Sequence, residues 1–259
     1  MTPDRRTALR AGAALFAAGT AVTGCAPAPP ARTPRPPAAG TGAAPSPPAG
    51  PAPGPRRFPG HPAEITRGSG ARPEIALTFH GGGDPATARA LLTEAERADA
   101  RLTVLAVGSW LDAHPALARR VLDGGHDLGN HTQRHLDVNA LPEDGVRAEI
   151  AGCADRLRRL TGSAGTWFRP SRAQGASPLV ARVARSLGYP HVLSYGVDSL
   201  DHTSPGAPAV VRTVLDGARP GAVVSLHFGY PDTVAALPAL LDELHRRGLR
   251  AVTTTELLT

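Results

Sequence analysis

The sequence predicts an α/β fold in which about seven parallel strands close into a barrel-like sheet. Over residues 73–259, short apolar runs alternate regularly with longer segments whose apolar residues have helical spacing. Strands that are joined through helices pair in parallel. About seven such units within one domain favour closure over an open sheet. Polar side chains follow several of the runs, and α/β folds place their chemistry at the carboxyl ends of their strands.

The individual elements follow from local signals. The first apolar run ends in glycines, and the next segment has apolar residues at helical spacing from Ala88 to Ala95. The longest helical segment is followed by Gly162, which is typical of a helix C-terminus. We expect strands at 74–79, 102–107, 127–132, 166–170, 192–196, 222–228 and 250–253, and helices at 85–98, 115–122, 142–160, 178–187, 208–218 and 232–247.

The net charge of +6 lies entirely outside the predicted folded region. Residues 1–60 contain seven arginines and one aspartate, whereas residues 61–259 contain 21 arginines and 21 acidic residues. A neutral domain without a basic run is a poor ligand for nucleic acid, so we expect no nucleic-acid partner.

The first 60 residues have the pattern of an export signal and a tether. Arg5 and Arg6 precede a weakly apolar stretch that ends at Val22-Thr23-Gly24-Cys25, which resembles a bacterial lipobox. Residues 1–24 are therefore expected to be a lipoprotein signal, with Cys25 acylated; an ordinary secretory signal with an incidental cysteine is the alternative. Residues 25–60 hold 13 of the 27 prolines and predict a disordered Pro/Ala-rich linker, because such a segment has little to bury.

Two histidines four residues apart follow the third expected strand, in the run from Asn130 to His135. If the backbone turns helical there, the imidazoles of His131 and His135 face the same way and could hold one cation. Two solvent-facing histidines on a loop are the alternative.

Five motifs follow one another in order at the ends of successive expected strands. They are Thr78-Phe79-His80-Gly81-Gly82-Gly83-Asp84, Asn130-His131-Thr132-Gln133-Arg134-His135, Phe168-Arg169-Pro170, Asp198-Ser199-Leu200-Asp201-His202 and Ser225-Leu226-His227. Together they resemble the polysaccharide deacetylase family of carbohydrate esterases, the proteins with a NodB homology domain. The resemblance covers residues 73–259 and implies a distorted (β/α) barrel.

The resemblance also implies roles for individual residues. Family members bind a divalent ion through an aspartate and two histidines, and by position His131 and His135 match these histidines. His227 matches the general acid that protonates the leaving amine, and Asp201 matches the carboxylate that orients this acid. Arg169 matches the arginine that pairs with the family's carboxylate base.

The first motif departs from the family, whose pattern is Thr-Phe-Asp-Asp-Gly-Pro, because His80 and Gly81 replace both aspartates. His202 likewise replaces a usual tryptophan. Two assignments of roles are possible. In the first, His80 is the general base and Asp84 is a metal ligand. In the second, which we favour, His80 is a third imidazole ligand and Asp84 is the general base, since a three-histidine site with an open position activates water on zinc.

We therefore expect a zinc-dependent hydrolase that removes N-acetyl groups from an extracytoplasmic amino-sugar polymer, either peptidoglycan or a chitin-like glycan. It would be a monomer that contacts the membrane only through a lipid anchor on the outer face of the bacterial cell membrane. Two alternatives stay open. One is a non-catalytic glycan- or wall-binding lipoprotein on a degenerate deacetylase fold, and the other is hydrolysis of a small non-sugar amide or an ester.

Overall fold

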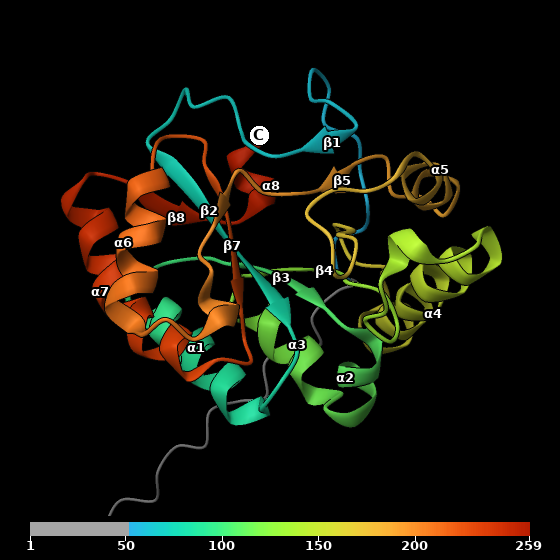
Figure 1. Ribbon diagram of the computed structural model, residues 1–259, viewed down its shortest axis with the longest axis horizontal. Helices are drawn as coiled ribbons and strands as arrows, with labels where there is room; N and C mark the ends of the chain where they lie inside the picture. The colour runs from blue at the N-terminus through green and yellow to red at the C-terminus, as the bar shows by residue number, and fades with distance from the viewer. Residues whose placement is uncertain (1–51) are drawn as a thin grey trace, which may run out of the picture. The chain divides into compact units, whose positions relative to one another are not determined.

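A computed structural model describes residues 52–259 of the chain (Figure 1). The predicted export signal, the acylation site at Cys25 and the linker up to residue 51 lie outside the described residues. Within residues 52–259, no helix is both long enough and apolar enough to span a membrane.

The sheet is built around β2, which pairs with three other strands. Seven of its eight residues are buried, and His80 is the exception. A strand buried in this way is typical of a parallel sheet covered by helices, and the named strands of this sheet all pair in parallel. The order is β4-β3-β2-β7-β6, with β8 paired to the start of β2. The strands are β2 (Glu74–Gly81), β3 (Thr103–Ala106), β4 (Asp127–Asn130), β6 (Val197–Asp198), β7 (Val223–His227) and β8 (Arg250–Val252).

A second parallel pair, β1 (Glu64–Ile65) with β5 (Val192–Leu193), extends the curve of the sheet. Phe168 connects this pair to β4, because it forms parallel bridges with Asn130 and with Val192. The predicted parallel α/β barrel is thus confirmed. The strand expected at 166–170 is wrong except for the bridge at Phe168, since Pro170 has no N–H to continue a ladder.

Helices surround the curved sheet, with α1, α6 and α7 on the left of the view and α4 and α5 on the right (Figure 1). The six expected helices are present, whereas α2 and α8 are additional short helices in segments that we expected to be loops. The helices are α1 (Pro85–Arg97), α2 (Gly108–Ala113), α3 (Ala116–Asp123), α4 (Glu143–Thr161), α5 (Pro178–Ser186), α6 (Ala207–Gly217), α7 (Pro231–Arg246) and α8 (Thr254–Leu257), with 3-10 turns at Val138–Ala140 and Asp201–Thr203.

The packed region begins well before residue 73. Phe58 is buried and stacks on Trp167, with ring centroids 5.0 Å apart and planes 15° from parallel. Its backbone N–H donates to Nε2 of His191 at 3.0 Å. The last residues of the predicted linker therefore pack against the barrel, and Trp167 is a core residue.

The strand register brings the predicted site residues to one edge of the barrel. His80 on β2 is the pairing partner of His227 on β7. Ala106 at the end of β3 pairs with Gly81 on one side and with Asn130 on the other. Because the strands are parallel, their carboxyl ends meet at the same edge, as the sequence pattern predicts.

Candidate active site

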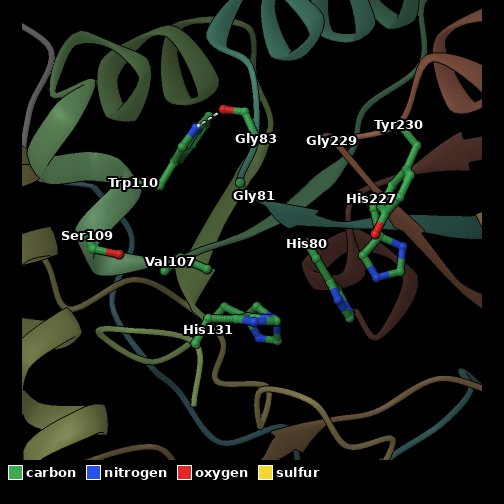
Figure 2. Close-up of a pocket in the computed structure, with 12 residues that line it drawn as sticks. His80, Gly81, Gly83, Val107, Ser109, Trp110, His131, His227, Gly229 and Tyr230 are labelled. Atoms are coloured by element: carbon green, nitrogen blue, oxygen red, sulfur yellow. Dashed lines mark hydrogen bonds between the residues drawn. The ribbon is translucent and has the colours of Figure 1, made fainter. Parts of the chain in front are cut away.

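Four histidines line a cavity of about 580 Å³ at the carboxyl ends of the strands (Figure 2). The ring of His80 lies 4.4 Å from that of His131 and 4.3 Å from that of His227, measured between centroids. The ring of His135 lies 4.9 Å from that of His131. The structure therefore brings together the three proposed metal ligands and the proposed general acid.

The turn that carries His131 and His135 is not helical, so the helical spacing that would align the two rings is not what brings them together. Thr132 and His135 have positive φ angles of 67° and 58°. The two rings approach each other through this strained loop rather than through the spacing of a helix. Burial, followed by the positive charge of Arg172, lowers the pKa of His135.

His131 presents one unpartnered nitrogen. Its side chain is fully buried, and its Nδ1 lies 3.1 Å from the carbonyl oxygen of Arg169. Because a carbonyl can only accept, Nδ1 carries the proton and Nε2 keeps its lone pair, for which the described residues offer no hydrogen-bond partner. Burial, reinforced by His135, holds the pKa of His131 well below its usual range. Histidines that bind metals usually donate their other ring N–H to a carbonyl or carboxylate, as His131 does here.

His80 takes the place of the family's first aspartate at the end of β2. Burial and the neighbouring His131 hold its pKa well below the usual range, so this imidazole is also neutral. Its Nε2 lies 3.4 Å from the hydroxyl of Ser225. The next residue, Gly81, has little room for a side chain, because a Cβ there would lie 3.0 Å from the backbone of Ala106 and from Val104.

Asp201 and His227 form a fully hydrogen-bonded pair. Oδ1 of Asp201 accepts from Nδ1 of His227 at 2.7 Å. Oδ2 accepts from the backbone N–H of His227 at 2.8 Å and from the hydroxyl of Thr233 at 2.6 Å. Burial alone would raise the pKa of Asp201, but the hydrogen bonds from His227 and Thr233 outweigh it and hold this pKa below the usual range. His227 therefore has Nε2 available toward the cavity.

Arg169 has no carboxylate partner among the described residues, contrary to the role that the resemblance implied. Its Nε donates to the carbonyl oxygen of Leu193 at 2.9 Å, and one Nη donates to the hydroxyl of Thr78 at 2.8 Å and to the carbonyl oxygen of Ser194 at 3.0 Å. The other Nη is buried without a partner. Burial lowers the pKa of this guanidinium to about 9.

Asp84 does not reach the cavity, so both sequence-based roles for this residue are corrected. Its exposed carboxylate caps α1 by accepting from the backbone N–H of Ala86 at 2.8 Å. Pro85 follows as the first helical residue, a pattern that favours helix initiation. The preceding Gly83 has a φ of 82° and its carbonyl accepts from the indole of Trp110 at 2.8 Å, which fixes the loop in place.

Sequence reasoning missed several residues of the cavity wall. Trp110 and Tyr230 contribute aromatic surface to this wall. Tyr230 lies three residues after His227, and that position after a strand end was the available signal. The remaining lining residues that we had not proposed are Gly81, Gly82, Gly83, Val107, Ser109 and Gly229.

The side chains of His80, His131 and His135 have the chemistry of cation ligands, although their donor atoms do not all lie within 4.8 Å of one another in this structure. His80, His131 and His135 are kept neutral by burial, and one of them has a buried nitrogen without a partner. Imidazole nitrogens suit zinc and neighbouring transition metals. The cavity wall contains no carboxylate among the described residues, so a metal held here would have nitrogen ligands and solvent.

Known proteins resemble this chain in sequence and in structure. The family model for polysaccharide deacetylases matches residues 67–192. The chain is 33% identical over 188 residues to a peptidoglycan-N-acetylglucosamine deacetylase of Bacillus cereus, covering 71% of this chain and 87% of the relative. It is 29% identical to a chitooligosaccharide deacetylase of Rhizobium leguminosarum bv. phaseoli, covering 69% and 84%. A similar solved structure is a CE4 family pseudoenzyme from Bacillus anthracis, with a TM-score of 0.72, 23% identity and coverage of 77% and 70%.

Proposed function

Since this chain belongs to the polysaccharide deacetylase family, we propose that it is a metal-dependent hydrolase that removes N-acetyl groups from an amino-sugar polymer of the cell wall. The observation that carries the proposal is the Asp201–His227 pair, which faces His80 and His131 across one cavity. The names of the relatives point to peptidoglycan or to chitin-like glycans as substrates.

In this proposal His80, His131 and His135 hold the cation, with zinc as the expected ion. When bound there, a zinc ion would acidify a water molecule and polarise the amide oxygen of the substrate. The carbonyl of Arg169 fixes the orientation of His131. Because the cavity wall offers no carboxylate, no side chain is assigned as a separate base.

His227 has the role of proton donor. Its Nδ1–H is held by Asp201, so Nε2 is the atom that gives a proton to the leaving nitrogen. The buried carboxylate stabilises the protonated imidazole and keeps the ring in one orientation, and Thr233 holds that carboxylate from its other side. Trp110 and Tyr230 form apolar walls against which a sugar ring could lie.

The test of this proposal is acetate release from N-acetylated chitooligosaccharides and from peptidoglycan by the zinc-loaded protein. We expect release by the parent chain and none by a His131→Ala variant. His245→Asn is the matched control, because His245 is exposed on α7 away from the cavity. No release by the parent under any metal loading would contradict the proposal.

A second candidate function is glycan binding without catalysis. It is favoured by the unpartnered Nη of Arg169 and by the absence of a carboxylate from the described cavity wall. Under this alternative the parent chain binds chitooligosaccharides, as measured by calorimetry, but releases no acetate.

We also propose that the chain is exported and anchored by a lipid at Cys25 on the outer face of the bacterial cell membrane, within reach of its polymer. The support is the lipobox-like run that ends at Cys25 and the cell-wall substrate named for the Bacillus cereus relative.

A clickable fatty acid that is fed to the cells should label the protein. Cys25→Ser should abolish the label, whereas Cys153→Ser should keep it because Cys153 is buried. Equal labelling of the Cys25→Ser variant would contradict the anchor.

A further inference from the structure

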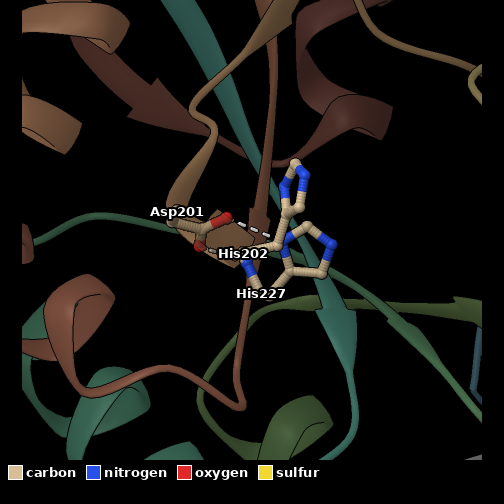
Figure 3. A group of neighbouring side chains, drawn as sticks. All are labelled: Asp201, His202 and His227. Carbon is tan, nitrogen blue, oxygen red and sulfur yellow. Dashed lines mark hydrogen bonds and ion pairs between the residues drawn. The ribbon is translucent and has the colours of Figure 1, made fainter. Parts of the chain in front are cut away.

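Asp201, His202 and His227 form a cluster of possible metal ligands beside the cavity (Figure 3). One donor atom from each of the three lies within 4.8 Å of the other two. Within residues 52–259, no other group of three His, Cys, Asp or Glu residues meets that spacing. The rings of His202 and His227 are 5.5 Å apart, and His202 is exposed to solvent.

We propose that His202 and His227 bind a second divalent transition-metal ion at the mouth of the cavity, separate from the ion proposed at His131. Two imidazoles and solvent would complete its coordination. Imidazole ligands select zinc, copper or nickel over magnesium or calcium.

The hydrogen bonds of Asp201 determine which atoms would bind. Its Oδ2 already accepts from the backbone of His227 and from Thr233, and its Oδ1 accepts from Nδ1 of His227. Asp201 is therefore an orienting group, and Nε2 of His227 is the ring atom left for a metal. A histidine that donates its other N–H to a carboxylate is the common arrangement at metal sites.

His202 is the residue that makes this site particular to the chain. The family pattern has a tryptophan at this position, and an indole offers an N–H donor but no lone pair to a metal. His202 lies in the 3-10 turn Asp201–Thr203, which begins at Leu200 with a φ of 57°. This short turn places the imidazole of His202 beside His227 at the surface.

The second ion would be bound more weakly than the first. His202 supplies an exposed ligand, and the ring of His227 lies only 4.3 Å from that of His80, so the two cations would repel each other. If His227 is the proton donor, a metal on its Nε2 blocks proton transfer, and excess zinc inhibits the enzyme. This consequence rests on the proposed function, whereas the binding itself does not.

The test is zinc stoichiometry at equilibrium, measured by dialysis and elemental analysis on the full-length, untagged chain with Cys25→Ser in every protein. We expect the parent to bind two zinc ions at saturating micromolar zinc. His202→Asn and His131→Ala should each bind one, and the double variant should bind none. His245→Asn, another exposed histidine, should still bind two.

The outcomes separate the two sites. If the site at His131 does not bind zinc, the parent should bind one ion and His202→Asn should bind none. This result would support the second site and would contradict the metal site of the proposed function. The second site is overturned if His202→Asn binds as much zinc as the parent and the double variant binds as much zinc as His131→Ala alone. Urea unfolding of His202→Asn shows that the comparison is made on folded protein.

Discussion

On the β7 side of the cavity, both carboxylate oxygens of Asp201 accept hydrogen bonds and His227 is held through its Nδ1. On the β2 side, Arg169 and His131 each have a buried nitrogen without a partner. The difference shows where this chain has changed. The proposed proton-donor pair, Asp201 and His227, has all of its hydrogen bonds. In the first motif, His80 and Gly81 stand where the family pattern has two aspartates, and the neighbouring guanidinium and imidazole nitrogens have no carboxylate to contact among the described residues.

The largest effect on activity is expected from removing His227 from its hydrogen-bonded pair with Asp201. His227→Ala should slow amide hydrolysis by about 10²- to 10⁴-fold, because an amine leaves poorly unless a positioned acid protonates it. Hydrolysis of an activated acetate ester should fall much less, since its leaving group needs no proton. The measurement is kcat on both substrates with matched zinc content. A similar loss on both would instead indicate a structural role for His227.

A smaller effect, on stability, is expected from placing a carboxylate at position 80 near the unpartnered nitrogen of Arg169. Arg169 donates to the hydroxyl of Thr78, and Thr78 and His80 lie on the same face of β2, so the two side chains are close. His80→Asp should therefore give the guanidinium a carboxylate partner and raise the free energy of unfolding of the metal-free protein by about 1–3 kcal/mol relative to His80→Asn. The gain should disappear in an Arg169→Met background when urea unfolding is measured. An equal stability of His80→Asp and His80→Asn would show that this guanidinium does not reach position 80.

The smallest effect is expected on the pH dependence of stability, from His126, a buried histidine outside the cavity. His126 accepts the N–H of Leu102 at its Nδ1, at 3.0 Å, and burial lowers its pKa from 6.5 despite the nearby Glu96. The folded state therefore binds fewer protons than the unfolded state at this residue. Its contribution is present above pH 6.5 and is lost as the pH falls through the lower folded-state pKa.

His126→Gln should consequently flatten the decrease in unfolding free energy between pH 7 and 5, by about 1 kcal/mol for each unit by which the pKa is lowered. Urea unfolding at several pH values measures this. An unchanged pH profile would mean that His126 is not the group that titrates there.

Sequence patterns predicted the parallel barrel and the strand ends that carry His80, His131 and His227, because apolar runs and strand register determine both. They did not predict β1 or β6, since these two-residue strands do not lie in a longer apolar run. The positive φ angle of His135 depends on its tertiary surroundings and was equally inaccessible.

Asp84 is a different case, because its true role was visible in the sequence. An aspartate directly before a proline and a helical segment is a typical helix start. The cap on α1 and the contact between Gly83 and Trp110 hold the loop outward.

The central claim is that His80 has replaced a carboxylate as a metal ligand, and the most direct test is the zinc that stays bound after dialysis against metal-free buffer. We expect His80→Ala to lose this zinc and the parent chain to keep it. Asp84→Asn should keep both zinc and activity, because asparagine also caps helices well and Asp84 lies outside the cavity. Full zinc retention by His80→Ala, or zinc loss by Asp84→Asn, would contradict this account.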